Sequence, residues 1–328
     1  MENCFHHITA LLISAVLTTG CHESERMDVI RLDQLSATET DDLTDNNDIN
    51  YDSTTMTAGI NAMISIMAPD YTGNIDRFIS DYSGRESTKL FRRDVDARLG
   101  SLDAVEKSLG RLRGAMERDM PGVGFPSRIY GIITPYNQSV MTVDSVMLIG
   151  LNHYLGSDYE GYAAFGKNQA ELKRKARIAV DVAEALIRSK YPMIVTDSTT
   201  LLQHLLYDGA VTTTMAIMMP EVSISDILGI SDDALRTIKR NERPIWNAII
   251  ENGLLFSTDE QMARRLLQPA PNSAVICDWC PGRAARYIAH HMVKSYLKTN
   301  GRPDDLSELL DAGFYNSTNA LAACRYAP

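Results

Sequence analysis

The chain has little cysteine, a deficit of basic residues and no long apolar run after residue 21. Its 32 Lys and Arg face 42 Asp and Glu, for a net charge of −10. This argues against a nucleic-acid-binding surface, because phosphate binding needs a basic stripe. No later segment holds roughly eighteen consecutive apolar residues, so we expect no membrane-spanning helix there. The sequence also lacks G-x-S-x-G, a P-loop and a glycine-rich dinucleotide motif, the common signatures of hydrolases and nucleotide-binding proteins.

The first 21 residues are typical of a bacterial lipoprotein signal. An apolar stretch, Ile8–Val16, is followed by Leu17–Gly20 (LTTG) and then by Cys21, in the manner of a lipobox. The stretch is too short to span a bilayer and lies where a secretory signal lies. We therefore expect residues 1–20 to be removed as a signal peptide and Cys21 to be lipidated with acyl chains such as palmitate. No Lys or Arg precedes Cys21, a departure from the usual signal, and the alternative is a buried N-terminal helix that ends at Gly20.

Lipidation would fix where the protein resides. Removal of residues 1–20 from the 328 leaves a chain of 308 residues that is exported and lipid-anchored to the cell envelope, and we expect it at the outer membrane. The expected partners are the membrane, through the lipid anchor, and envelope proteins that the sequence does not identify. We expect no nucleic acid partner.

The exported chain divides into a tether and one domain. Residues 21–56 are acidic and rich in Thr, Asn and Asp, and we assign them to a tether. Within it, Met27–Leu35 alternates well enough to predict one short strand. Residues 57–328 show no convincing internal linker and are assigned to a single domain.

Helical periodicity dominates that domain. Phe91–Arg118 reads as a long helical stretch, broken or bent at Gly100. Arg128–Pro135 and Val140–Leu151 are rich in β-branched residues and read as two strands, arranged as a hairpin. We predict an α+β fold that is mainly α-helical, with one small β-sheet.

Several phrases of the second half resemble the gliding-motility lipoprotein B (GldB-like) family. They are Val143–Tyr159, Leu201–Gly209, Ile245–Asp259 and Pro281–Leu297. The resemblance covers about residues 127–328. It implies a lipoprotein, in agreement with Cys21, and a non-catalytic structural or binding role at the envelope.

The same layout is similar to a class of predicted zinc metalloproteases. In those proteins a small sheet precedes a helix with H-E-x-x-H, whose two His hold zinc while the Glu activates water. The corresponding segment here is Val180–Glu184 (VDVAE), in which both His are missing and the Glu is replaced by Asp181. The resemblance thus implies a zincin-like scaffold that is a pseudo-enzyme, with no catalytic residue and no cofactor.

A divergent metal-dependent hydrolase is the first alternative. His204 and Asp208 are four residues apart on one predicted helix, so both side chains can point at one spot. Glu184 and Asp181 could approach from the preceding helix. The structural reading of the same residues is a His–Asp pair that stabilises a helix and an acidic face in solvent.

A thiol–disulfide protein is the second alternative. Cys277 and Cys280 form a C-x-x-C motif between a short apolar run and a helix. Redox catalysis would need further strands after the motif, so we favour a disulfide, either within the motif or with Cys324.

The predicted helix Gly282–Lys298 carries a basic face opposite an apolar stripe. We expect that face to be solvated. The functional reading is that it lines a cleft or meets an acidic partner, and we select Arg283, together with Asp208, for such a surface. The residues of the basic face are Arg283, Arg286, His290 and Lys294.

Overall fold

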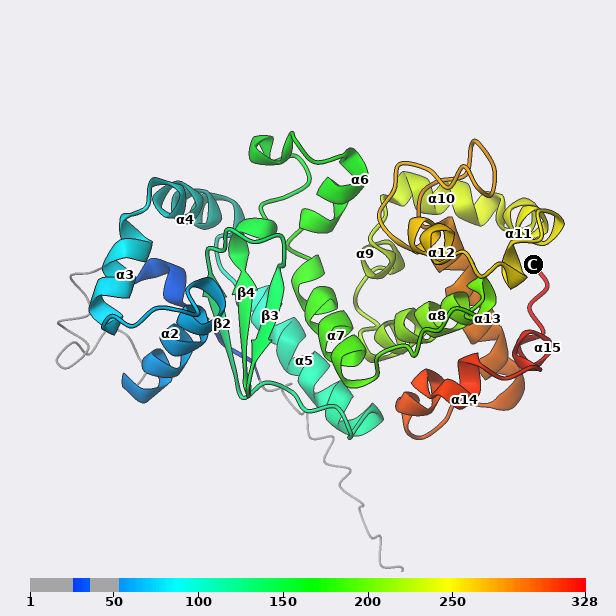
Figure 1. Cartoon of the computed structure of the whole chain (residues 1–328), viewed down its shortest axis with the longest axis horizontal. Coiled ribbons are helices and arrows are strands. Elements are labelled where there is room, and N and C mark those ends of the chain that lie inside the picture. The colour runs from blue at the N-terminus through cyan, green and yellow to red at the C-terminus, as the bar shows by residue number, and fades with distance from the viewer. Residues whose placement is uncertain (1–25, 36–52) are drawn as a thin grey trace, which may run out of the picture.

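The structure, a computed structural model, describes residues 26–35 and 53–328 (Figure 1). The expected signal peptide, Cys21 and most of the expected tether lie outside the described residues. Within the described part, helices dominate and one small four-stranded sheet is present, which confirms the predicted α+β, mainly α-helical class. None of the helices in these two ranges has both the length and the apolar character needed to cross a membrane.

The sheet lies in the half of the molecule that precedes helix α7 (Arg177–Lys190) in the chain. Its order is β1-β2-β4-β3, with β1 parallel to β2, β2 parallel to β4, and β3 antiparallel to β4. All five residues of β4 are buried, as expected of a strand covered on both faces. The strands are β1 (Val29–Arg31), β2 (Arg128–Ile132), β3 (Val140–Val143) and β4 (Val146–Gly150).

The expected hairpin between Arg128–Pro135 and Val140–Leu151 is wrong. The second segment folds back on itself, so β3 and β4 form the hairpin and β2 pairs in parallel with β4. Val143 pairs with Val146, which leaves a two-residue loop whose first residue, Asp144, has a φ of 51°. Asp tolerates this left-handed conformation, which tight hairpin turns require.

The short strand expected in Met27–Leu35 is present as β1 and belongs to the domain rather than to a free tether. Met27, Val29 and Leu35 are buried in the hydrophobic core. Glu106 of helix α5 (Asp103–Asp119) holds this edge strand in place. Its Oε1 accepts a hydrogen bond from the Val29 amide (2.9 Å), and its carbonyl accepts one from the Met27 amide (3.1 Å).

The long helical stretch is divided where glycine predicts it. Helix α4 ends at Leu99, Gly100 follows with a φ of 53°, and α5 begins at Asp103. Figure 1 shows α2, α3 and α4 beside the sheet and α5 running past it toward the centre of the molecule. The bounds are α2 (Ser53–Met67), α3 (Ile75–Gly84), α4 (Glu86–Leu99) and α5 (Asp103–Asp119), with 3-10 turns η1 (Leu32–Gln34), η2 (Leu151–His153) and η3 (Glu160–Tyr162).

Three helices form the centre and position the site. Helix α7 (Arg177–Lys190) lies between the sheet and the C-terminal half, where α8 (Leu201–Met218) and α13 (Ala284–Asn300) pack together (Figure 1). A capping box between Thr200 and Gln203 starts α8. A Cβ at Gly209 would lie 2.3 Å from the Ala289 carbonyl oxygen, so glycine is required where α8 and α13 meet.

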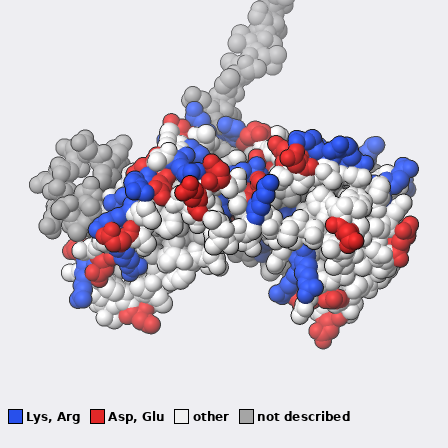
Figure 2. Space-filling view, turned by 90° about the horizontal axis from the view of Figure 1, so that it is seen from above, with Lys and Arg blue, Asp and Glu red and all other residues white. Residues whose placement is uncertain are grey.

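The remaining elements surround this centre and share one hydrophobic core with it. On the face shown in Figure 2, acidic and basic side chains are interleaved. These elements are α6 (Lys167–Ala170), η4 (Glu171–Lys173), α9 (Ile224–Leu228), α10 (Asp232–Arg240), α11 (Glu242–Glu251), η5 (Leu254–Phe256), α12 (Glu260–Leu267), η6 (Leu306–Leu310), α14 (Ala312–Tyr315) and α15 (Ala320–Cys324).

Candidate functional site

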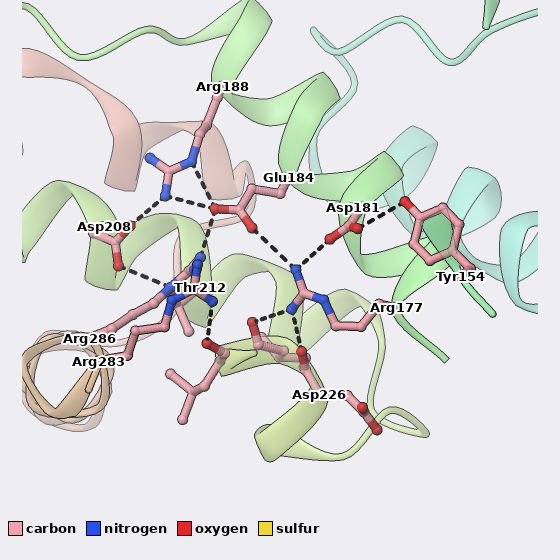
Figure 3. Close-up of polar contacts among 12 residues, drawn as sticks. Tyr154, Arg177, Asp181, Glu184, Arg188, Asp208, Thr212, Asp226, Arg283 and Arg286 are labelled. Atoms are coloured by element: carbon pink, nitrogen blue, oxygen red, sulfur yellow. Dashed lines mark hydrogen bonds and ion pairs between the residues drawn. The ribbon is translucent and has the colours of Figure 1, made fainter. Parts of the chain in front are cut away.

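One face of α7 carries a polar stripe that leads into a cluster of arginines and carboxylates. Arg177, Asp181, Glu184 and Arg188 follow at intervals of four, three and four residues, so they lie on the same face of the helix. Figure 3 shows these side chains meeting others from α8, α9 and α13. The site is therefore assembled from four helices.

Glu184 is the centre of the cluster. Its Oε1 lies 2.8 Å from Arg286 Nη2 and 2.9 Å from Arg188 Nη2, and its Oε2 lies 3.9 Å from Arg177 Nη2. Burial opposes ionisation of this carboxyl, but the surrounding arginines outweigh it and hold the pKa of Glu184 well below its ordinary value. Glu184 is thus an ionised carboxylate surrounded by guanidinium groups.

Asp208 joins the same cluster from α8. It forms ion pairs with Arg188 and with Arg286, whose Nε lies 3.1 Å from Asp208 Oδ2. The Nε of Arg286 also donates to the Thr212 hydroxyl (3.1 Å), and Arg286 is only 2% exposed. Arg286 therefore links α13 to both α7 and α8 through charged contacts in the interior.

Asp181 connects the cluster to the sheet. It forms an ion pair with Arg177, and the Tyr154 hydroxyl, from the segment that follows β4, donates to its Oδ2 (2.9 Å). Arg177 also donates to the carbonyls of Asp226 and Ile227 in α9, the latter at 3.2 Å. Burial opposes the charge of Arg177, but Asp181 and Glu184 outweigh it and raise its pKa.

Arg283 differs from the other arginines because it has no carboxylate partner among the described residues. Its Nη1 donates to the Leu228 carbonyl (2.8 Å), its Nε has no hydrogen-bond partner, and the residue is 7% exposed. Burial, together with the charges of Arg286 and Arg177, lowers the pKa of Arg283 to about 9. Its backbone is left-handed, with a φ of 61°, which is strained for a residue other than glycine.

Gly229 makes room for that guanidinium. A Cβ at this position would lie 2.2 Å from Arg283 Nη1 and 2.4 Å from Leu172 Cδ2. Gly229 has a φ of 66° at the end of α9, so it combines a helix terminus with a close approach of the arginine.

The cluster opens into a cavity of about 570 Å³. Arg177, Asp181, Glu184, Arg188 and Arg283 line one part of it. The remaining lining residues come from the β2–β3 loop, from the segment after β4 and from the region around α6: Asn137, Gln138, Ser139, Val140, His153, Tyr154, Phe165, Gln169, Leu172 and Lys173, with Ala185 and Pro269.

Lys173 is a second cation of the cavity without a carboxylate partner among the described residues. Its Nζ lies 2.7 Å from His153 Nδ1, while His153 Nε2 lies 2.8 Å from the Tyr136 carbonyl oxygen. Burial and the nearby Lys173 lower the pKa of His153 to about 4. The imidazole is therefore neutral, with Nε2–H donating to Tyr136 and Nδ1 accepting from the Lys173 ammonium.

Of the expected metal ligands, the structure brings Glu184 and Asp208 together but not His204. Both carboxylates form ion pairs with Arg188 and Arg286, so guanidinium groups lie between the two carboxylates. His204 Nε2 is buried without a hydrogen-bond partner, and burial lowers the pKa of this imidazole. In the part of the chain that the structure describes, no three His, Cys, Asp or Glu side chains are grouped as metal ligands.

The expected solvated basic face of Gly282–Lys298 is wrong. Arg283, Arg286 and His290 are buried, and of the four residues only Lys294 is exposed. His290 Nδ1 lies 2.9 Å from the Thr213 hydroxyl of α8, and burial lowers its pKa to about 3. Because α13 packs against α8 and reaches Glu184 of α7 through Arg286, polar residues of this face lie in the interior.

The cysteines of the described residues are free thiols, so the expected disulfide is not formed. Cys280 and Cys324 are buried, whereas Cys277 is partly accessible. The Cys280 amide donates to the Cys277 carbonyl (3.0 Å), so the C-x-x-C motif forms a turn. Burial raises the pKa of Cys324 to about 12 and that of Cys280 above its ordinary range, which keeps both protonated.

Sequence reasoning missed the arginine partners of the site. The stripe from Arg177 to Arg188 was visible as an i, i+4, i+7, i+11 pattern in which two acidic residues are flanked by two arginines, a signal that could have found half of the cluster. Nothing local indicates that Arg286 lies opposite it.

Comparison with known proteins bears on the family. The family model described as gliding motility protein GldB matches residues 21–328. No curated protein matches, and no solved structure matches, so the zincin-like scaffold that the sequence suggested has no support from these comparisons. The match covers all of the described domain and begins at Cys21, and the chain therefore belongs to the gliding motility protein GldB family.

Proposed function

We propose that this chain is a lipoprotein held in the cell envelope, at the outer membrane, by acyl chains on Cys21. Its domain has a structural or binding role in gliding motility and does not catalyse a reaction. The family match supports the first part, because it begins at the cysteine that follows the signal-like segment. A lipid anchor also agrees with an apolar segment too short to span a bilayer.

The arrangement around Glu184 carries the non-catalytic part of the proposal. In a zincin, this region of the helix would present two imidazoles to zinc. Here Val180 is an apolar core residue, and Glu184 and Asp208 are held by Arg188 and Arg286. The positively charged guanidinium groups between the two carboxylates repel a metal cation. The cluster therefore serves to hold α7, α8 and α13 in one arrangement.

The anchoring is tested by replacing each cysteine of the N-terminal segment in turn. We expect Cys21→Ser to abolish incorporation of a labelled fatty acid and to release the protein from the membrane fraction. Cys4→Ser is the matched control, because Cys4 precedes the cleavage point and should leave labelling unchanged. Retention of the label in Cys21→Ser would contradict the lipoprotein assignment.

The non-catalytic role is tested by elemental analysis of the purified full chain beside an Asp208→Asn variant. We expect no stoichiometric transition metal in either protein. A stoichiometric metal in the wild type that is lost in the variant would overturn the proposal and favour the divergent hydrolase.

A further inference from the structure

The cavity beside Glu184 contains more positive than negative charge. Three carboxylates, Asp181, Glu184 and Asp208, are matched by Arg177, Arg188 and Arg286, each of which forms ion pairs with two of them. This leaves two cations in the lining without a carboxylate partner among the described residues.

Arg283 is the first of these cations. It is 93% buried, since its exposed fraction is 7%, and within residues 26–35 and 53–328 its only hydrogen bond goes to the Leu228 carbonyl. Removing an unpaired charge from water opposes folding, so a buried arginine normally has an anionic partner. The Nε of Arg177, which also lines the cavity, is buried and unpartnered as well. Two arginines of the cavity lining therefore each carry an N–H group without a partner among the described residues.

Lys173 is the second cation of the cavity lining without a carboxylate partner among the described residues. Its ammonium contacts the neutral imidazole of His153 and lies 5.5 Å from the centre of the Phe165 ring. A neutral imidazole and an aromatic face attract an ammonium less strongly than a carboxylate does, and Lys173 forms no ion pair with a carboxylate among the described residues. Both residues line the same cavity as Lys173, and so does Arg283.

We infer that this cavity binds a small dianionic ligand whose two negative charges reside on oxygen atoms, with Arg283 and Lys173 as its principal contacts. Two unmatched cations call for two negative charges, which a phosphate monoester or a dicarboxylate supplies. Arginine presents its N–H groups in a fork that suits such oxygens, and lysine adds a compact positive charge. A volume of about 570 Å³ is in the range of small-molecule sites.

The strained backbone of Arg283 agrees with this assignment. A non-glycine residue in the left-handed region persists where its surroundings impose it, and such residues cluster at binding sites. Here Gly229 and the start of α13 hold the side chain against the cavity. The lowered pKa of Arg283 also agrees with a buried cation that lacks an ion-pair partner, because burial and neighbouring positive charges lower it.

This inference goes beyond the proposed function and does not depend on it. A lipoprotein with a structural role could leave the cavity without a ligand, and a soluble form of the chain could bind the dianion. A failed test of lipid anchoring or of the non-catalytic role therefore does not decide whether the cavity binds a dianion, and a failed binding test does not decide the proposed function.

The test is calorimetric titration of the purified full chain with inorganic phosphate, glycerol 3-phosphate and succinate, with uncharged glycerol as the negative control. We expect at least one of the three dianions to bind in a 1:1 ratio, more weakly as salt is added, and glycerol not to bind. Arg283→Gln should weaken binding by about tenfold or more, as loss of a charge-assisted contact does. It should not lower the melting temperature, because it removes an unpaired buried charge.

Two further variants complete the test. Lys173→Gln should also weaken binding, and it provides an independent check if Arg283→Gln does not fold. Arg265→Gln, which removes an exposed arginine of α12 outside the cavity, should bind as the wild type does. Absence of binding by all three dianions, or equal loss in Arg265→Gln and Arg283→Gln, would overturn the inference.

Discussion

Glu184 of α7 and Arg286 of α13 are 102 residues apart in the chain and form an ion pair of 2.8 Å in the interior. Arg286 is almost fully buried and also contacts Asp208 and Thr212 of α8. The relative positions of three helices thus depend on the charge of one side chain.

Replacement of Glu184 should destabilise the fold. Glu184→Gln leaves Arg286 and Arg188 with Asp208 as their remaining carboxylate, and we expect the free energy of unfolding to fall by ~3 kcal/mol, as on breaking a buried ion pair. Chemical denaturation, monitored by circular dichroism, measures the free energy of unfolding of both proteins. Glu251→Gln is the control, because Glu251 is exposed at the end of α11 and should change stability by less than ~0.5 kcal/mol.

The same pair predicts a pH dependence. The folded pKa of Glu184 lies below its ordinary value of 4.5, so the folded state holds fewer protons than the unfolded state. The contribution of Glu184 is complete above pH 4.5 and is lost as the pH falls toward the lower folded pKa. The stability difference between wild type and Glu184→Gln should therefore shrink below pH 4.5, and a constant difference would contradict the assignment.

His153 should remain neutral in mildly acidic solution. Its pKa of about 4 in the folded protein lies below the ordinary 6.5, so its stabilising contribution is complete above pH 6.5 and is lost as the pH falls toward 4. Nitrogen-15 NMR at pH 5.5 should show one neutral tautomer with the proton on Nε2. The signal is assigned by its loss in His153→Gln, and titration near pH 6.5 would disprove the prediction.

The contact between α8 and α13 should not tolerate a methyl group at Gly209. We expect Gly209→Ala to lower the free energy of unfolding by about 1–3 kcal/mol, because the Cβ meets the Ala289 carbonyl. Gly114→Ala in α5 is the matched control: a Cβ there meets nothing within 4 Å, and alanine should be neutral or stabilise by about 0.5–1 kcal/mol. Equal stability of the two variants would contradict the close packing.

The thiols of the domain should differ in reactivity. In the native protein we expect Cys277 to react with a thiol reagent and Cys280 and Cys324 to stay protected until unfolding, because they are buried and protonated. Mass spectrometry of the alkylated peptides checks this. A disulfide between any two of the three would refute it.

Local patterns predicted much of the fold. The break expected at Gly100 is where α4 ends, because the physics of helix ends involves only neighbouring residues. The pairing of β2 with β4 was missed, since residue type does not distinguish a parallel neighbour from an antiparallel one. The turn at Asp144, without glycine, gave little sign of the β3–β4 hairpin.

The same local patterns predicted some residues of the site but not their roles. Asp181, Glu184, Asp208 and Arg283 were singled out, and all four lie in or beside the cluster. Their roles were not predicted, because the basic face of α13 was expected in solvent. Whether an arginine of α13 is solvated or buried depends on the packing of α13 against α8, which no local pattern encodes.

The parallel pairing of β1 with β2 has a mechanical consequence. β1 lies at the sheet edge, a few residues after Cys21, and is held by its ladder to β2 and by Glu106. A pull along the strand loads these hydrogen bonds together, in shear, rather than opening them one at a time. Tension from the N-terminal side would thus enter the domain through its sheet.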